Sequence, residues 1–253
     1  MKGIDISEGS GKVDFRELKG EGYEFVICRA GYGSDASQVD KRFHEYVNGA
    51  LDAGLHVGAY WFIYARTLDE AEANGKAFLD VVSYWPSRLD MPLFIDYEYD
   101  STRYYEQETG IKESRDTATE YIRRAADVVE RAGYYTGVYL NPDYIKNHVD
   151  MNRLRQYTLW LAQWQVPEPS YQCGIWQKSG DTKIPQATGG VDLNECFTDY
   201  PTVIRRVGLN GFKPEPAPQA TGLTEKTKSG DRWELITTSD NIVIKLGGKT
   251  NVT

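Results

Sequence analysis

The chain has 253 residues, of which 40% are hydrophobic and 26% are charged, and this composition is ordinary for a globular protein. Its formal net charge of −8 argues against a protein that binds nucleic acid or an anionic membrane. No apolar stretch is long enough to cross a bilayer, so we expect no membrane insertion. Because Met1-Lys2-Gly3 leads directly into a strand pattern, we find no signal peptide and expect synthesis as a soluble cytoplasmic protein.

The cysteines and histidines do not form a recognisable metal or disulfide pattern. Cys28, Cys173 and Cys196 are far apart and include no C-x-x-C pair, which excludes a disulfide framework and a zinc site. The histidines are equally scattered, so we expect no metal site and no cofactor. Cys28 lies inside an apolar run and is predicted to be a buried structural thiol.

In chain order, apolar strand patterns alternate with amphipathic helix patterns. The predicted strands are residues 3–7, 23–30, 55–64, 91–98, 134–140, 158–164, 174–177 and 191–194. The predicted helices are residues 13–19, 43–51, a helix that opens at the Thr67 cap, 118–132 and 142–146, while residues 104–108 are expected to form a solvated loop. This alternation predicts an α/β fold with a mostly parallel sheet, closed or nearly closed into a β/α barrel.

Two carboxylates end the fourth predicted strand. Asp96 and Glu98 follow the apolar run that begins at Met91, and side chains two residues apart on a strand point to the same side. Neighbouring acids that lose hydration repel each other, so one keeps its proton while the other stays charged. Glycoside hydrolysis requires this division into a proton donor and a charged partner.

Two further acids are predicted to lie beside this pair. Asp5 and Asp192 also fall at what we assign as carboxyl ends of strands, the rim where β/α barrels build their active sites. Asp5 has an alternative as a cap for the loop at residues 9–11, and the residue pattern alone does not decide between the two.

Residues 211–222 differ in composition from the rest of the chain. Alternating prolines with small polar residues predict an extended linker after a catalytic region at residues 1–210. Beyond it, residues 233–238 and 241–246 are predicted to pair as a hairpin within a short β segment at 223–253. Because a single hairpin is marginally stable alone, we expect this segment to pack on the barrel, to pair with another copy of the chain as a homo-oligomer, or to begin a further module.

Seven sequence blocks follow one another along the chain: GIDIS (3–7), FVICRAGYG (25–33), GAYWF (58–62), DYE (96–98), LWLAQW (159–164), WQ (176–177) and VDLN (191–194). In this order they resemble the glycoside hydrolase family 25 muramidases, the Chalaropsis-type lysozymes that include many phage endolysins, and the resemblance covers about residues 1–207. Cys28 and Trp61 depart from the residues most common in the family, but neither belongs to the acid set.

The resemblance implies an irregular TIM-like barrel that cleaves the β-1,4 bond between N-acetylmuramic acid and N-acetylglucosamine in peptidoglycan. It implies that Glu98 is the general acid, that Asp96 orients or charges the site, and that Asp5 and Asp192 line the groove. With no signal peptide, such a protein is expected to reach the bacterial wall by endolysin-type release or to act outside the cell. Because wall recognition in such proteins normally lies in the C-terminal region, residues 223–253 are expected to belong to an element that binds cell walls or forms a homo-oligomer.

Other polar and aromatic residues are candidates to bind the sugar chain. Tyr60, Phe62, Tyr139 and Trp164 are candidate sugar platforms, although aromatic residues on barrel strands also fill cores, and about half of them are expected to face a groove. Gln163 and Gln177 are candidate partners for sugar hydroxyl groups.

The reaction route and two other classes of function remain open from the sequence. We expect retention, with Asp96 or Asp192 acting as nucleophile or as the group that orients the substrate's N-acetyl amide. A metal-dependent hydrolase could use the same four acids as oxygen ligands. A carbohydrate-binding barrel without catalysis usually lacks one of the acids, and all four are present here.

Overall fold

The computed structural model describes residues 1–215 together with residues 233–238 and 241–246. The chain divides into two compact units, Met1–Pro214 and Glu215–Thr253, and each is described by itself. The described part of the chain has no helix that is both long enough and apolar enough to cross a membrane.

The first unit is a closed barrel whose strands neighbour one another in sequence order. The strands are β1 (Lys2–Ile6), β2 (Phe25–Tyr32), β3 (His56–Phe62), β4 (Leu93–Asp96), β5 (Thr136–Leu140), β6 (Thr158–Ala162), β7 (Ile175–Lys183) and β8 (Gly190–Cys196). Neighbours from β1 to β7 are parallel, whereas β8 runs antiparallel to both β7 and β1 and closes the ring. The predicted mostly parallel barrel is therefore confirmed.

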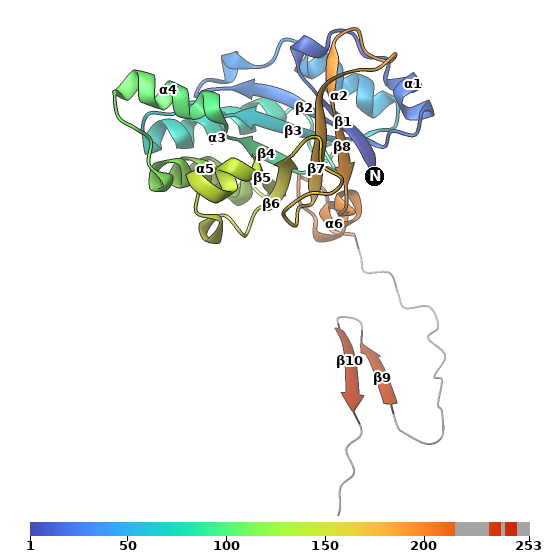
Figure 1. Cartoon of the computed structure of the whole chain (residues 1–253). Helices are drawn as coiled ribbons and strands as arrows, with labels where there is room; N and C mark the ends of the chain where they lie inside the picture. The colour runs from blue at the N-terminus through green and yellow to red at the C-terminus, as the bar shows by residue number, and fades with distance from the viewer. Residues whose placement is uncertain (216–232, 239–240, 247–253) are drawn as a thin grey trace, which may run out of the picture. The chain divides into compact units, whose positions relative to one another are not determined.

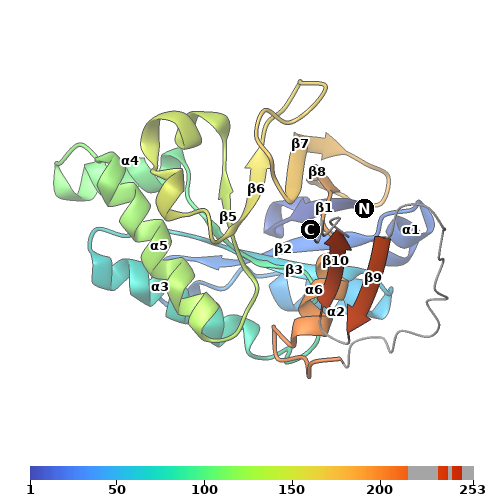
Figure 2. The ribbon, with the colours of Figure 1, turned by 90° about the horizontal axis from the view of Figure 1, so that it is seen from below.

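Helices cover the outside of the barrel (Figures 1 and 2). They are α1 (Phe15–Gly20), α2 (Phe43–Asp52), α3 (Leu68–Val82), α4 (Tyr99–Thr109), α5 (Arg115–Arg131) and α6 (Tyr200–Val207), with short 3₁₀ or π turns at Glu8–Ser10, Ala36–Gln38, Tyr144–His148 and Met151–Arg153. The Thr67 cap is confirmed, because its side chain accepts a hydrogen bond from the Glu70 N–H at the start of α3.

The alternation of side chains along each strand divides the core into two parts. One set of strand residues, including Ile4, Val26 and Ile95, packs against the helices in the larger core cluster. The other set includes Phe25, Phe94, Trp160 and Ile175, and it fills the barrel interior in a second cluster. The polar residues that continue this inward set toward the rim of the barrel form the candidate site.

Three local features differ from the sequence predictions. Residues 104–108 lie in the helix α4, and Tyr105 is buried, so this segment is not a solvated loop. The helix α6 was not predicted, because its short sequence, with Tyr200 and Ile204 buried, shows too few apolar repeats to indicate a helix. Strand β7 is also longer than predicted, since residues 178–183 continue it with little apolar alternation.

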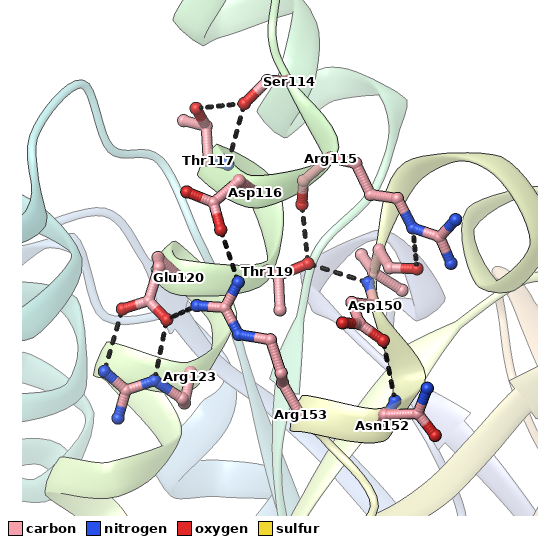
Figure 3. A network of polar contacts seen from close by, with 11 residues as sticks. Ser114, Arg115, Asp116, Thr117, Thr119, Glu120, Arg123, Asp150, Asn152 and Arg153 are labelled. Atoms are coloured by element: carbon pink, nitrogen blue, oxygen red, sulfur yellow. Dashed lines mark hydrogen bonds and ion pairs between the residues drawn. The ribbon is translucent and has the colours of Figure 1, made fainter.

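A polar network attaches the start of α5 to the segment that leads into β6 (Figure 3). Arg153 forms ion pairs with Asp116 and Glu120, both on α5. Thr119, also on α5, accepts a hydrogen bond of 2.8 Å from the Asp150 N–H. Because these groups are mostly near the surface, we interpret the network as a clamp that holds the helix in place more than as a source of stability.

The second unit contains two described strands, β9 (Trp233–Thr238) and β10 (Asn241–Leu246), which pair antiparallel. The rest of the predicted linker and C-terminal segment, residues 216–232, 239–240 and 247–253, lies outside the described residues. The predicted roles of this segment in wall binding or oligomerisation therefore remain predictions.

Candidate active site

Four acidic side chains converge at one rim of the barrel. Asp5 lies near the end of β1, Asp96 is the last residue of β4, and Glu98 immediately precedes α4. Asp192 was predicted at the carboxyl end of a strand, and that was wrong, since it lies near the beginning of β8. It still reaches the same rim because β8 runs antiparallel, and the barrel register sets Asp5 and Asp192 directly opposite each other.

Asp96 and Glu98 form a close carboxyl pair. The strand β4 ends at Asp96, but Glu98 still has an extended backbone, with φ of −136° and ψ of −172° at that residue. This conformation agrees with the prediction that the Asp96 and Glu98 side chains lie on the same side. Asp96 is buried, and its Oδ1 accepts no hydrogen bond from the described residues. The Glu98 backbone N–H donates to Ser101 Oγ at 3.2 Å, which attaches the acid to the first turn of α4.

Burial controls the protonation of this pair. Burial is the largest cause that raises the pKa of Asp96 well above its ordinary value, and the neighbouring charge of Glu98 adds to it. Burial also raises the pKa of Glu98, whereas its hydrogen bond with Asp96 lowers that pKa. Lost hydration is therefore the main cause of the raised pKa of Glu98, and Asp96 acts on that pKa in the opposite direction. The pair can therefore hold a proton in the range where isolated carboxyl groups have lost theirs.

Asp5 and Asp192 are joined through the amide of Gln177. Gln177 Nε2 donates to Asp5 Oδ2 at 3.0 Å and to Asp192 Oδ2 at 3.1 Å. Its Oε1 accepts from the Tyr139 hydroxyl at 2.9 Å and from Trp164 Nε1 at 3.1 Å. This buried amide thus uses its whole hydrogen-bonding capacity inside the protein. Gln177 orients the acids and aromatics, and it has no group left for a sugar hydroxyl in this arrangement.

Asn194 gives Asp5 a second amide donor. Asn194 Nδ2 donates to Asp5 Oδ2 at 2.7 Å, and its Oδ1 accepts from Trp160 Nε1 at 2.8 Å inside the barrel. Asp5 therefore belongs to the rim cluster, and its alternative as a cap for the loop at residues 9–11 is wrong. Asn194 was noticed in the sequence only because it shares a strand face with Asp192.

Burial raises the pKa values of these two acids as well. For Asp5 burial is the largest cause, and the charge of Asp192 raises its pKa further, while the two amide donors lower it. The pKa of Asp192 is raised mainly by burial and is lowered by the hydrogen bond from the Asp181 N–H, which is 2.7 Å long. The Gln177 amide thus bridges the carboxyl groups of Asp5 and Asp192, which lie on adjacent strands and would repel each other if both were charged.

Two of the four acids, Asp5 and Asp192, line a cavity of about 230 Å³. Its walls include Asp5, Ser7, Ser10, Tyr60, Asp181 and Asp192. Most of these groups are hydrogen-bond donors or acceptors, which suits a hydroxyl-rich ligand better than an apolar one.

The structure separates the predicted sugar-binding residues into different environments. Tyr60 is half-buried and lies at the cavity wall, with its ring centroid 5.7 Å from that of Trp160. Trp164 is 51% exposed at the rim, whereas Tyr139 is only 8% exposed and belongs to the core inside the barrel. Phe62 is half-buried beside Tyr64. Exposure therefore favours Trp164 and Tyr60 as sugar contacts and places Tyr139 among the supporting residues.

Gln163 contributes to a neighbouring loop. Its side-chain Oε1 accepts a hydrogen bond of 2.8 Å from the Ser170 N–H, and its backbone oxygen accepts from Trp176 Nε1 at 2.7 Å. These contacts account for Gln163 as a residue that shapes the segment after β6.

Arg29 is a charged residue near the acids that the sequence analysis did not single out. It projects from β2 and pairs with Asp40 at 2.8 Å, and its charge is among the influences that lower the pKa of Asp96. The available signal was a charged residue in an otherwise apolar strand, residues 25–30. In the described residues, no group of three His, Cys, Asp or Glu side chains is arranged to hold a metal ion.

A closed β/α barrel with a buried carboxyl pair at its catalytic rim is an arrangement typical of glycoside hydrolases. The family model "Glycosyl hydrolases family 25" matches residues 4–187, and the chain belongs to this family.

Individual relatives agree with this assignment. The chain is 27% identical over 197 residues to the autolytic lysozyme of Clostridium acetobutylicum; the match covers 77% of this chain and 55% of that protein. The chain thus spans little more than half the length of this curated relative.

Two solved structures share the fold. The CTP1L endolysin has a TM-score of 0.66 at 23% identity, covering 79% of this chain and 67% of that one. The second is the modular autolysin LytC of Streptococcus pneumoniae, solved in complex with a synthetic peptidoglycan ligand. It has a TM-score of 0.65 at 21% identity, and the match covers 76% of this chain and 46% of that one.

Proposed function

We propose that this protein is a peptidoglycan hydrolase of the muramidase class, cleaving the β-1,4 bond between N-acetylmuramic acid and N-acetylglucosamine in bacterial cell walls. The observation that carries the proposal is the Asp96–Glu98 pair, whose burial keeps a proton available at the barrel rim. Family membership and the peptidoglycan ligand of LytC support this choice of bond and substrate.

Glu98 is the general acid in this proposal. The oxygen of the leaving sugar must gain a proton as the glycosidic bond breaks, and a carboxyl group with a raised pKa delivers that proton near neutral pH. The hydrogen bond from its backbone N–H to Ser101 Oγ fixes the Glu98 backbone against the first turn of α4.

Asp96 orients the substrate's N-acetyl amide. It is the more deeply buried member of the pair, and its Oδ1 is free of donors from the described residues, so it can accept the amide N–H. The amide oxygen would then attack the anomeric carbon, and water would open the resulting ring to the retained product. A direct attack by Asp96 or Asp192 on the same carbon also gives retention.

The anomer formed first tests the route. NMR of a fresh digest is expected to show the β anomer from the β-linked substrate, and an α anomer would overturn both retaining routes. A substrate whose N-acetyl group is replaced by a free amine separates the two, because only the amide-assisted route requires that group.

The proposed function is tested by digesting purified peptidoglycan with the intact protein and with the Glu98→Gln variant. Fragments are reduced with borohydride and identified by mass spectrometry. We expect reduced muramic acid ends from the intact protein and their loss in the variant. Reduced glucosamine ends would instead indicate a glucosaminidase, and cut peptides would overturn the glycosidase assignment.

The same assay addresses the other classes of function. Binding to walls without any digestion would favour a carbohydrate-binding barrel, and loss of activity with a chelator would favour a metal-dependent hydrolase. We further propose that the protein works on the wall as endolysins and autolysins do, a setting supported by the names of its relatives.

A further inference from the structure

A second recess lies near the acidic cavity and is not used by the proposed chemistry. It has a volume of about 270 Å³ and is formed by the end of β2, the segment after β3 and the helix α4. Its walls include Tyr32, Gln38, Tyr64, Arg66 and Tyr104. Three tyrosines from three separate elements thus surround one small hollow.

The tyrosines form a continuous aromatic path that leads back to the acids. The Tyr64 ring centroid is 5.2 Å from that of Tyr104, 6.2 Å from that of Tyr32 and 5.0 Å from that of Phe62. Phe62 is in register with Asp96 on the neighbouring strand. The recess is therefore a lateral continuation of the acid-bearing rim.

The segment that carries Tyr64 is held rigidly from outside the barrel. Asn74, fully buried on α3, donates to the Tyr64 backbone oxygen at 2.9 Å and accepts from its N–H at 3.2 Å. The Tyr121 hydroxyl on α5 donates to the Arg66 backbone oxygen at 2.6 Å. Binding platforms gain affinity when their conformation is fixed before the ligand arrives.

The opposite wall is fixed in the same way. Trp61 is buried on β3, and its Nε1 donates to the Gly33 backbone oxygen at 2.8 Å. The Gly33 N–H donates to the Phe62 backbone oxygen at 3.0 Å. These bonds hold the turn that presents Tyr32, whose side chain is 40% exposed.

The charges in the recess favour a neutral ligand. Arg66 is the cation at its wall, and it already pairs with Glu70 at 2.5 Å and with Glu108 at 3.7 Å. An anion would compete with these carboxylates for the guanidinium. Tyrosine faces with hydroxyl edges instead suit a sugar ring, which presents apolar C–H faces and polar rims.

We infer that this recess is a subsite for a further N-acetylhexosamine unit of the same glycan strand, beyond the two sugars that flank the cleaved bond. The inference rests on the proposed function for its substrate class. It predicts that affinity increases when the bound oligosaccharide becomes long enough to reach the three tyrosines.

The test measures binding without cleavage. Glu98→Gln protein is titrated calorimetrically with peptidoglycan disaccharide, tetrasaccharide and hexasaccharide, and the titrations are repeated with Tyr32→Ala or Tyr104→Ala added. We expect each added substitution to weaken binding of the longest oligosaccharide by roughly three- to tenfold, as loss of one stacking contact predicts, with a smaller effect on the disaccharide. Tyr84→Ala, which removes a 74% exposed tyrosine outside the recess, is the matched control.

The outcomes separate the subsite from the proposed function. If the added substitutions weaken the binding of all three oligosaccharides equally, or weaken none of them, the subsite proposal is wrong, whatever the intact protein cleaves. If the intact protein cleaves no peptidoglycan but the length-dependent loss of affinity appears, the muramidase proposal fails and the sugar subsite stands. Thermal unfolding of each variant verifies that the substituted proteins are folded.

Discussion

At the residue scale, burial assigns different tasks to chemically similar side chains. Asp5, Asp96, Glu98 and Asp192 are all carboxyl groups with raised pKa values, and burial is the first cause in each. Their hydrogen bonds differ. Asp5 accepts both of its amide donors through Oδ2, whereas the buried Asp96 Oδ1 accepts no hydrogen bond from the described residues. The two amides therefore hold the Asp5 carboxyl group in place, and Asp96 lacks such support at Oδ1.

The raised pKa of Glu98 predicts the pH dependence of the reaction. The acid must be protonated to act, so activity is present below its pKa and is lost as the pH rises through it. We expect the alkaline limb of the kcat/KM profile to lie above the ordinary glutamate range, measured on soluble glycan at constant ionic strength. An alkaline limb near pH 4.5, the ordinary value, would contradict the assignment of Glu98 as a buried acid.

Gln177 and Gln163 provide a matched pair at the same scale. Both were predicted to bind sugar hydroxyls, but Gln177 bonds two acids while Gln163 bonds the backbone of Ser170. Gln177→Leu is expected to lower kcat/KM by about ten- to a hundredfold, because it removes one donor from each of the two acids and leaves the Tyr139 hydroxyl and the Trp164 N–H without their acceptor. Gln163→Leu is expected to lower kcat/KM much less than Gln177→Leu does.

A pH profile identifies Gln177 as a positioning residue. Removing its amide donors should raise the pKa of Asp5 further and thereby change the profile, an effect that a loss of packing alone would not produce. Equal losses in the two variants, with unchanged profiles, would show that Gln177 has no special role.

At the element scale, the direction of one strand and the contact of two helices shape the site. The antiparallel β8 brings Asp192 to the rim from the beginning of a strand. Helices α3 and α5 pack closely where Gly75 faces Ala125, and α3 in turn carries Asn74, which holds the segment after β3. Close helix packing therefore supports the rim from the outside.

Substitution of Gly75 tests this packing. A Cβ atom at Gly75 would lie 2.6 Å from the Ala125 backbone oxygen and 2.9 Å from the Val128 Cβ, so the helices would have to separate. We expect Gly75→Ala to reduce the free energy of unfolding by about 1–3 kcal/mol in urea denaturation. Gly20→Ala, where a Cβ meets nothing within 4 Å, is the control and should be neutral or slightly stabilising. Equal stability of the two variants would refute the close-packing argument.

At the scale of the whole molecule, the site lies within the unit Met1–Pro214. That unit has its own closed sheet and its own cores, so we predict that a chain ending at Pro214 keeps its melting temperature and its activity on soluble oligosaccharides.

Loss of residues 215–253 is predicted to weaken binding to intact walls or to lower the mass of the particle in solution. Co-sedimentation with walls and light scattering measure the two effects. If neither changes, the proposed role of the C-terminal segment is wrong, and if the shortened chain unfolds, its independence is wrong.

The sequence by itself determined the positions of the strands, the barrel class and the acid pair, because these depend on local patterns. Alternating apolar residues set the strands, and the extended backbone at Asp96 and Glu98 sets their common side. It also determined that four acids belong together, through the resemblance of its ordered motifs. The sequence did not predict helix α4, because its many polar residues resemble those of a loop.

Only the tertiary structure decided which groups hold those acids. Gln177 and Asp5 are 172 residues apart in the chain and meet because β1 joins β8 and closes the barrel. The same closure sets Asp192 opposite Asp5 and determines how much hydration each carboxyl group loses. Hydrogen bonds and burial between distant segments have no local signature, and they are what divides the acids between catalysis and support.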